Sequence, residues 1–337
     1  MITIEASHIN NGGSLILLKF LLKELEKCQI HVVVYIKYRH IYEDLSNSLF
    51  QYIELRKTSS LRTLFRYMRK RSNVLFFCSL PPFVFCQNSY VYFHSEYYSC
   101  KPGLNGSNKT FSEKVKSYVY YYWISIFKKN VQSFFCQTSL VEKNLKKTYS
   151  LIPIILPFYS LPVADNIVYC KEYDFFYPAI GTKHKNHILL FEAFEKLLSH
   201  RKATLAVTIS EQFENLFFYI NKINTKYPNS IINLGYCNEK QLELSYKKSK
   251  ALIFPSTMES LGLPLIEALT FGLKVMSSDL EYSYMVISNP IVFNPIDSSD
   301  IALVMNNYLD GKFENISQKV LVENKISLLI DLLCRKV

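Results

Sequence analysis

Apolar, strand-like runs alternate with helix-like segments along this chain, and the same pattern occurs in both halves. In the first half, the predicted strands are residues 1–6, 31–36, 73–78, 90–93 and 131–136, and the predicted helices are 14–28, 60–71, 111–127 and 138–147. In the second half, the predicted strands are residues 173–177, 203–208, 231–234, 251–254 and 273–276, and the predicted helices are 187–199, 211–226, 238–248 and 264–271. Strands that alternate with helices form parallel sheets covered on both faces, so we expect two α/β domains. The 337 residues suffice for a buried core in each, and the proline-containing span 152–165 is the predicted linker.

The net positive charge of the chain comes entirely from its first half. Residues 1–165 carry 21 Lys and Arg against 10 Asp and Glu, whereas residues 166–337 carry 18 of each kind. The whole net charge of +11 therefore lies in residues 1–165. Such asymmetry points to a polyanionic partner or a membrane surface that only one half contacts.

Two segments of this half have the composition of membrane-binding segments. Residues 56–71 hold seven cations, with apolar residues at helical spacing and three arginines on a neighbouring face: Leu61, Leu64, Phe65 and Met68, and Arg62, Arg66 and Arg69. This pattern predicts a basic amphipathic helix, which can lie on anionic lipid. The aromatic run 118–124 has lysines on both sides, at 114, 116, 128 and 129, as at a membrane interface. The alternative for each segment is a solvated helix packed on a sheet.

The sequence also argues against a membrane-spanning, secreted or metal-binding protein. No apolar run approaches the roughly 20 residues that cross a bilayer, and the N-terminus lacks the basic region and cleavage site of a secretion signal. We therefore expect a cytoplasmic chain that lies peripherally on the inner face of the cytoplasmic membrane. The eight cysteines are scattered without metal-ligand spacing, so we expect buried thiols in a reducing compartment and no metal site.

The segment Glu259–Glu267 carries the most specific chemical signal. It follows the predicted buried strand 251–254, and Pro264 stands where a first helical position is expected. Gly262 permits close approach of the backbone to a ligand. The first carboxylate would lie in a strand-to-helix loop and the second in the opening turns of the helix, with free N–H groups between them. A ligand with a phosphate in the middle and hydroxyls at both ends, such as a nucleotide sugar, fits this arrangement.

Residues 252–268 resemble the donor-binding signature of group 1 (family 4) retaining glycosyltransferases. The resemblance implies that Glu259 contacts the transferred sugar and that Glu267 holds the ribose hydroxyls. It also implies that backbone amides of the intervening residues bind phosphate and sugar: Ser260, Leu261, Gly262 and Leu263. The alternative reading is a helix-capping acid followed by an ordinary surface acid.

A second block of the resemblance opens the C-terminal half. The sequence Phe-Tyr-Pro-Ala at 176–179, followed by His-Lys-Asn at 184–186, matches the place where the family has a phosphate-binding lysine. The resemblance assigns Lys185 to the donor diphosphate. The family often adds an arginine six residues earlier, but Ala179 stands there, which leaves Lys183 as a possible substitute. As isolated residues, both lysines would be ordinary loop charges.

The N-terminal half supplies weaker matches. In the family, a glycine pair in the first strand-to-helix loop faces the donor diphosphate, and Gly12 and Gly13 match it; Ser14 is a candidate helix cap. A bare turn is the alternative. His94 follows a predicted strand, where many members of the family carry a histidine that contacts the sugar. Either Glu96 or His94 could face the site, and a structural, hydrogen-bonded histidine is a further alternative.

The resemblance implies a GT-B fold, in which two Rossmann-like domains have parallel sheets that face a central cleft. Residues 1–160 would bind the acceptor and residues 166–315 the nucleotide sugar, and a helical segment at 316–337 would pack back on the first domain. The implied activity is that of a retaining, metal-independent hexosyltransferase that needs no cofactor besides its donor. Its acceptor would be a lipid-linked saccharide in surface polysaccharide or lipopolysaccharide O-antigen synthesis. Both UDP and GDP sugars fit the donor motif.

Two other functions were compared with this one. A non-catalytic polyanion or nucleic-acid binder would use the basic residues 56–71, but no recognition motif accompanies them, so we expect no nucleic-acid partner. A phosphorylase or hydrolase of related architecture is the second alternative, and a phosphorylase would carry a lysine-bound pyridoxal cofactor.

Overall fold

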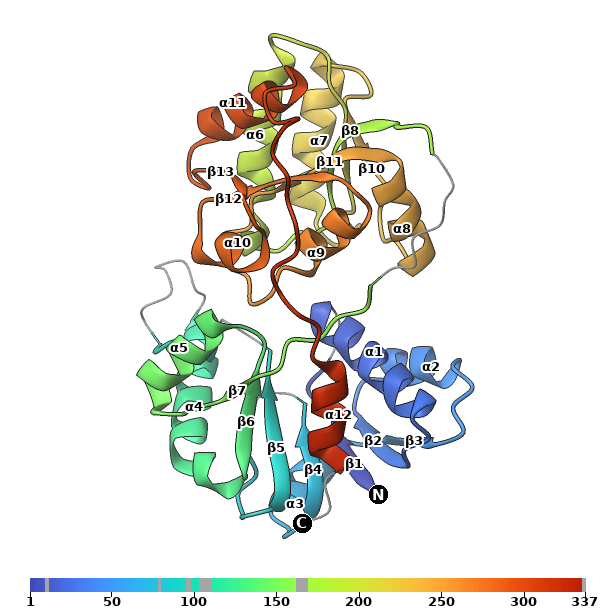
Figure 1. Cartoon of the computed structure of the whole chain (residues 1–337), viewed down its shortest axis with the longest axis vertical. Coiled ribbons are helices and arrows are strands. Elements are labelled where there is room, and N and C mark those ends of the chain that lie inside the picture. Colours follow the sequence, from blue (N-terminus) through green and yellow to red (C-terminus); the bar gives the residue numbers. More distant parts are fainter. Residues whose placement is uncertain (10–11, 78–79, 95–97, 103–110, 162–168, 335–337) are drawn as a thin grey trace. The chain divides into compact units, whose positions relative to one another are not determined.

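The computed structural model describes the chain except for residues 10–11, 78–79, 95–97, 103–110, 162–168 and 335–337 (Figure 1). Residues 111–113 are described as backbone only. The chain divides into two compact units. Unit 1 comprises Met1–Ser160 and Glu323–Val337, and unit 2 comprises Leu161–Val322. Each unit is built on one parallel sheet, as the alternation of strands and helices predicts.

The sheet of unit 1 has seven strands in the order β3-β2-β1-β4-β5-β6-β7, and all neighbours are parallel. The strands are β1 (Ile2–Glu5), β2 (Val32–Ile36), β3 (Ile53–Lys57), β4 (Ser72–Phe76), β5 (Gln87–Phe93), β6 (Ser133–Cys136) and β7 (Ile154–Ile155). Ile4 of the central strand lies between Val34 and Leu75, and none of the three side chains is exposed. These β-branched and aliphatic residues build the centre of the core.

The helices of unit 1 cover this sheet. They are α1 (Gly13–Lys27), α2 (Arg39–Ser46), α3 (Ser60–Tyr67), α4 (Phe111–Phe127), α5 (Ser139–Tyr149) and α12 (Ile326–Cys334), and a 3-10 turn, η2, covers Lys128–Asn130. Helix α1 buries a stripe of leucines with helical spacing: Leu17, Leu18, Leu21, Leu22 and Leu25. Its N-cap is Gly12, so Ser14 lies inside the first turn and is not the cap that the sequence suggested.

The C-terminal helix α12 belongs to unit 1 and packs against α1 (Figure 1). Two hydrogen bonds tie the segment before it to the end of the first half of unit 1. The Lys325 amide donates to the Pro157 carbonyl at 2.7 Å, and the Asn324 side chain donates to the Tyr159 carbonyl at 2.6 Å. The helix covers Ile326–Cys334, a shorter segment than the sequence suggested.

The sheet of unit 2 has six parallel strands in the order β10-β9-β8-β11-β12-β13. The strands are β8 (Tyr173–Tyr177), β9 (Leu205–Val207), β10 (Ile231–Asn233), β11 (Ser249–Phe254), β12 (Lys274–Ser278) and β13 (Ile291–Phe293). Residues 251–254 of β11 are not exposed at all. Successive strand residues point to opposite faces, so both faces of this sheet are covered.

The covering helices of unit 2 are α6 (His187–Leu198), α7 (Glu214–Lys226), α8 (Glu239–Lys247), α9 (Leu263–Thr270), α10 (Glu281–Val286) and α11 (Ser298–Leu309). A 3-10 turn, η3, covers Lys183–Lys185. Helix α8 begins at a capping box, in which Asn238 and Gln241 each accept from the other's backbone N–H at 3.0 Å. Helix α11 packs against α6.

Candidate functional site

Two loops at the carboxyl ends of neighbouring strands bring the predicted site residues of unit 2 together. Strands β8 and β11 pair in parallel, so the loops that follow them lie at the same edge of the sheet. The loop after β8 carries Lys185, and the loop after β11 carries Glu259. Lys185 Nζ forms a salt bridge with Glu259 Oε1, and these side chains are only 14% and 12% exposed. Two residues that are 74 positions apart in the sequence therefore form one charged pair.

Hydrogen bonds fix the backbone on both sides of this pair. The Thr257 amide donates to the His184 carbonyl at 2.8 Å, which ties the two loops together. The Tyr177 hydroxyl donates to the Lys185 carbonyl at 2.6 Å. Asn186, in the left-handed region with φ of 58°, donates from its side chain to the Pro295 carbonyl at 2.7 Å. Lys185 is thus held on a rigid turn and is not a mobile surface lysine.

An aromatic ring and a histidine lie beside the Lys185–Glu259 pair. The Lys185 ammonium also lies 5.4 Å from the centre of the Phe254 ring. Burial lowers the pKa of His184, the charge of Lys185 lowers it further, and Glu259 opposes them. His184 is therefore neutral at physiological pH. Of the two lysines of this turn, Lys185 is the partly buried one and Lys183 is exposed.

Helix α9 begins shortly after Glu259, at Leu263, and Gly262 precedes it. This glycine is the N-cap, with φ of 66° and ψ of 56°, and a Cβ there would lie 2.9 Å from Leu265 Cδ1. Both the left-handed backbone and the close contact require glycine. Leu261 is buried, whereas Ser260 and Leu263 are partly exposed. The first-turn amides of a helix have no acceptor inside it, so this start can receive an anion.

Glu267 lies in the second turn of α9 and is held by a tyrosine that the sequence did not single out. The Tyr246 hydroxyl donates to Glu267 Oε2 at 2.7 Å. Tyr246 is 1% exposed and stacks on Phe271, with ring centres 5.4 Å apart. The other carboxylate oxygen, Oε1, has no hydrogen-bond partner in the described part of the chain. Burial raises the pKa of Glu267, and the charge of Glu239 also raises it, against the Tyr246 hydrogen bond.

The predicted glycines of unit 1 lie at the start of α1. Gly12 is its N-cap, with φ of 70°, and Gly13 is its first residue. A Cβ at Gly12 would meet no atom within 4 Å, so the backbone conformation, and not crowding, explains glycine here. This open helix start leaves room for a ligand.

His94 follows β5 in unit 1, as the sequence predicts. Its ring stacks on Phe77, with centres 5.8 Å apart, and its Nδ1 has no hydrogen-bond partner among the residues that the structure describes. Burial lowers the pKa of His94 to about 4, against a hydrogen bond from the ring to the Tyr92 backbone. The ring is therefore neutral at physiological pH. Glu96, the alternative to His94, lies outside the described residues.

The basic helix of unit 1 differs from its sequence-based expectation. Helix α3 ends at Tyr67, and Arg66 turns inward, whereas the sequence placed it on the face of Arg62 and Arg69. Arg66 Nε donates to Glu5 Oε1 at 2.5 Å, its second nitrogen reaches Oε2 at 3.1 Å, and Arg71 donates to Oε1 at 3.0 Å. Glu5 is completely buried. Two of the seven cations therefore neutralise a core carboxylate.

In the described ranges, no cluster of three or more His, Cys, Asp or Glu side chains could hold a metal ion. No helix in the described part of the chain combines the length and the apolar character that a membrane crossing requires.

Comparison with known proteins points to one family. Residues 165–325 match the family model of glycosyl transferases group 1. WaaG, a glycosyltransferase involved in lipopolysaccharide biosynthesis, superposes with a TM-score of 0.69 at 14% identity, over 99% of this chain and 100% of WaaG. HepE of Anabaena, solved with UDP and glucose, gives 0.67 at 11% identity, over 98% and 95% of the two chains. A glycosyltransferase from Rickettsia africae gives 0.65 at 14%, over 98% and 92%. No curated protein sequence matches the chain.

Proposed function

We propose that this chain, a group 1 glycosyltransferase of GT-B fold, transfers a hexose with retention from a nucleotide sugar to a lipid-linked saccharide. Glycosyltransferase activity follows from the family, and the donor, the acceptor and the stereochemistry are our proposal. The observation that carries it is the arrangement around the start of α9. A fixed cation, a helix N-terminus and a carboxylate with an unpaired oxygen occur together within unit 2.

Each part of a nucleotide-sugar donor has a counterpart in this arrangement. The diphosphate would meet Lys185 and the first amides of α9, near Gly262. The ribose hydroxyls would donate to Glu267 Oε1, while Tyr246 holds the other oxygen in place. Glu259 would contact the transferred sugar. In the structure Glu259 neutralises Lys185, and a bound diphosphate would take over the lysine while Glu259 turns to the sugar hydroxyls.

Catalysis would depend on charge stabilisation. The bond between the anomeric carbon and the diphosphate breaks, and its electron pair goes to the diphosphate oxygen. The acceptor hydroxyl attacks from the same face and gives its proton to that oxygen, which retains the configuration. Lys185 and the α9 amides stabilise the charge that develops on the diphosphate. These fixed positive groups would do this without a metal ion or another cofactor.

Three residues of unit 1 have proposed supporting roles. Gly12 and Gly13 would present the amides of the α1 N-terminus to the donor diphosphate, which suits the open space at Gly12. His94 would hydrogen-bond the transferred sugar through its unpaired Nδ1, because its lowered pKa keeps the ring neutral.

We further propose that unit 1 lies on the cytoplasmic face of a membrane. Two helices expose apolar side chains at helical spacing. On α3 and its C-cap these are Leu61, Leu64, Phe65 and Met68, which are 38–63% exposed. On α4 they are Val115, Tyr118, Val119, Tyr122 and Ile126, which are 46–66% exposed. Exposed cations stand beside them, including Arg62, Arg69 and Lys70. Apolar faces bordered by cations suit an anionic lipid surface.

Vesicle binding tests the membrane part of this proposal. The chain should sediment with anionic vesicles but not with neutral ones, and binding should weaken as salt rises. The double variant Phe65→Ser/Ile126→Ser should bind more weakly. Phe218→Ser is the matched control, because Phe218 is 68% exposed but belongs to unit 2. Equal binding to both kinds of vesicle, or equal losses in the two variants, would disprove membrane contact through α3 and α4.

Titration calorimetry with UDP and GDP sugars tests the donor site. One of these donors should bind, and Glu267→Ala should weaken its affinity about tenfold or more, because a charge-assisted hydrogen bond to ribose is lost. Lys185→Met should weaken it comparably. Glu192→Gln is the control, since Glu192 is an exposed acid on α6 of the same unit. Unchanged affinity in Glu267→Ala would reject the site.

A further inference from the structure

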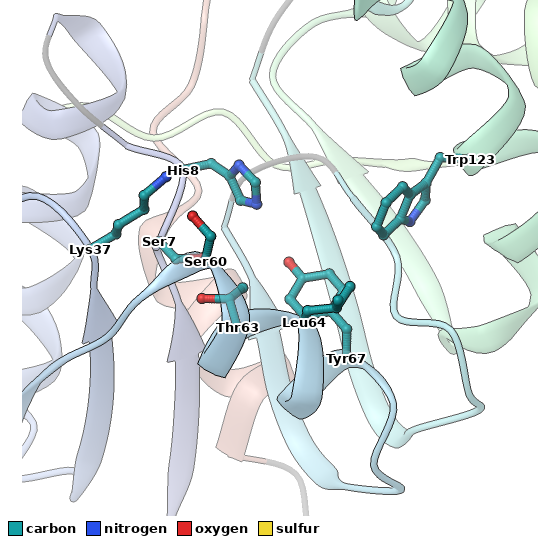
Figure 2. Close-up of a pocket in the computed structure, with 8 residues that line it drawn as sticks. All are labelled: Ser7, His8, Lys37, Ser60, Thr63, Leu64, Tyr67 and Trp123. Atoms are coloured by element: carbon teal, nitrogen blue, oxygen red, sulfur yellow. The ribbon is translucent and has the colours of Figure 1, made fainter.

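Unit 1 contains a cavity at the carboxyl ends of β1 and β2 (Figure 2). Its volume is about 110 Å³, whereas one water needs roughly 10–15 Å³. Ser7 and His8 follow β1, Lys37 follows β2, Ser60 begins α3, and Trp123 belongs to α4. Figure 2 shows His8 and Lys37 on one side of the cavity and Trp123 on the other. The space suits a phosphate or a single sugar ring.

A buried hydroxyl in the wall of the cavity lacks a partner. Ser7 is 1% exposed, and its Oγ makes no hydrogen bond to any residue that the structure describes. Buried hydroxyls are normally hydrogen-bonded, and an unpaired one destabilises the fold. A ligand oxygen in the cavity would supply the missing partner.

The cavity is electropositive. Lys37 is exposed and makes no ion pair with the described residues; its ammonium lies 5.3 Å from the centre of the Tyr38 ring. Burial lowers the pKa of His8, and the charges of Lys37 and Lys116 lower it further, against that of Glu5. Glu5 is itself neutralised by the two arginines described above.

The start of α3 adds to the positive potential. Ser59 caps the helix by accepting from the Arg62 amide at 3.3 Å, and Ser60 and Thr63 line the cavity. The first amides of a helix carry a partial positive charge. Hydroxyls, a lysine and a helix N-terminus together favour a phosphate over a neutral sugar.

The far wall of the cavity is apolar and continues to the surface. It includes Leu64, which is 38% exposed, and Trp123, whose indole N–H donates to the Pro81 carbonyl at 2.8 Å. The indole therefore presents carbon atoms to the cavity. Leu64 also belongs to the exposed apolar face of α3, so the cavity borders the surface that we propose to meet lipid.

We propose that this cavity binds the phosphate of the acceptor, and that the hydrocarbon chain of the same molecule lies on the exposed apolar faces of α3 and α4. The proposal rests on the proposed function and names the acceptor class as a phosphate-bearing amphiphile. Lys37 and the start of α3 bind the phosphate charge, and Ser7 Oγ donates to a phosphate oxygen.

Trp123 provides a direct readout, because it is the single tryptophan of the chain and lines the cavity. Dodecyl phosphate, below its micelle concentration, should change the tryptophan fluorescence saturably. Inorganic phosphate and the uncharged dodecyl glucoside should each bind at least about tenfold more weakly, because each lacks one of the two contacts. Equal affinity for inorganic phosphate would overturn the lipid source, and equal affinity for the glucoside would overturn phosphate recognition.

Point variants test the residues that are assigned to the phosphate. Lys37→Met should weaken dodecyl phosphate binding about tenfold or more, and Ser7→Ala about fivefold. Lys57→Met is the matched control, because Lys57 is also exposed at a strand end and lies 4.5 Å from the centre of the Tyr42 ring. Ser7→Ala should not lower the urea midpoint, since it removes an unpaired hydroxyl.

The same variants separate this proposal from the donor site. Nucleotide-sugar binding should be unchanged in Lys37→Met and Ser7→Ala, because neither residue is among those assigned to the donor. If donor binding persists while dodecyl phosphate binds both variants as tightly as the unaltered chain, the cavity proposal is wrong and the donor site stands. If donor binding fails while dodecyl phosphate binding depends on Lys37 and Ser7, the phosphate cavity stands and the donor site is wrong.

Discussion

Glu5 is the residue whose replacement should most weaken unit 1. Its carboxylate is completely buried at the end of β1 and accepts three hydrogen bonds from two arginines. Arg66 also lies 3.9 Å from the centre of the Tyr35 ring and donates to the Thr58 hydroxyl at 2.8 Å. In Glu5→Gln, the Arg66 and Arg71 side chains keep their charge but lose the compensating carboxylate. They are only 15% and 17% exposed, so water compensates them poorly.

The expected cost is that of breaking a buried ion pair. Removing one partner of such a pair costs about 3–5 kcal/mol, because an uncompensated charge remains in the interior. A unit of this size should lose about 2 kcal/mol of unfolding free energy per molar urea. The urea midpoint should therefore fall by about 1.5–2.5 M.

Tryptophan fluorescence isolates this unit from the other. Trp123 is the single tryptophan and packs against the core of unit 1, so its signal follows unit 1 even if unit 2 unfolds separately. Glu54→Gln is the matched control, since Glu54 pairs with Arg56 at 2.6 Å on the exposed strand β3. An exposed pair contributes little, so this control should leave the midpoint nearly unchanged.

A double variant tests the physical reason for the loss. Glu5→Gln combined with Arg66→Met removes the buried cation as well as the carboxylate. The double variant should lose less stability than the sum of the two single variants, because fewer uncompensated charges remain. Additive losses, or a Glu5→Gln midpoint equal to that of Glu54→Gln, would refute the reasoning.

Three further predictions concern unit 2. Burial lowers the pKa of His187 to about 4, so the stability that its neutral ring contributes is present above the unfolded value of 6.5 and is lost as pH falls toward 4. The variant His187→Phe should therefore escape an acid destabilisation of about 3 kcal/mol, measured by acid unfolding with circular dichroism. Parallel pH profiles of the variant and the unaltered chain would argue against this. The raised pKa of Glu267 means that the unit is more stable with this group protonated and that this stability is lost as pH rises through the folded value. Glu267→Gln should therefore be more stable than the unaltered chain at neutral pH, although it binds nucleotide more weakly. The nucleotide affinity of the unaltered chain should fall on acidification. An equal fall in Glu267→Gln would show that another group causes the pH dependence. Gly262→Ala should destabilise the unit by about 1–2 kcal/mol, because a Cβ is disfavoured in the left-handed region and would contact Leu265; an unchanged urea midpoint would contradict this.

Much of the fold could be predicted because its central strands are continuous apolar runs. Strand β8 and helix α4 have the predicted bounds, at Tyr173–Tyr177 and Phe111–Phe127. Strand β3 was missed because it is an edge strand that exposes charged residues, among them Glu54 and Arg56. Helix α2 was missed for a similar reason, since only Ile41 and Leu45 are buried in it. The other elements without a prediction were β7, β13, α10 and α11.

The motifs of the sequence name several residues of the candidate site, but not their arrangement. The motif around Gly262 predicts two acids and a helix start, and the structure has that helix. The pairing of Lys185 with Glu259 depends on β8 and β11 being neighbours, which no local pattern reveals. Tyr246 comes from a different helix, and with 25 tyrosines in the chain nothing marks it as the partner of Glu267.

A crystal structure of the chain with a bound nucleoside diphosphate or nucleotide sugar tests the central claim most directly. We predict the ribose hydroxyls within hydrogen-bond distance of Glu267 Oε1, and the diphosphate against Lys185 and the first turn of α9. Lys185 should then contact phosphate and no longer Glu259. A nucleotide bound elsewhere, with the Lys185–Glu259 salt bridge intact, would contradict the proposed donor site.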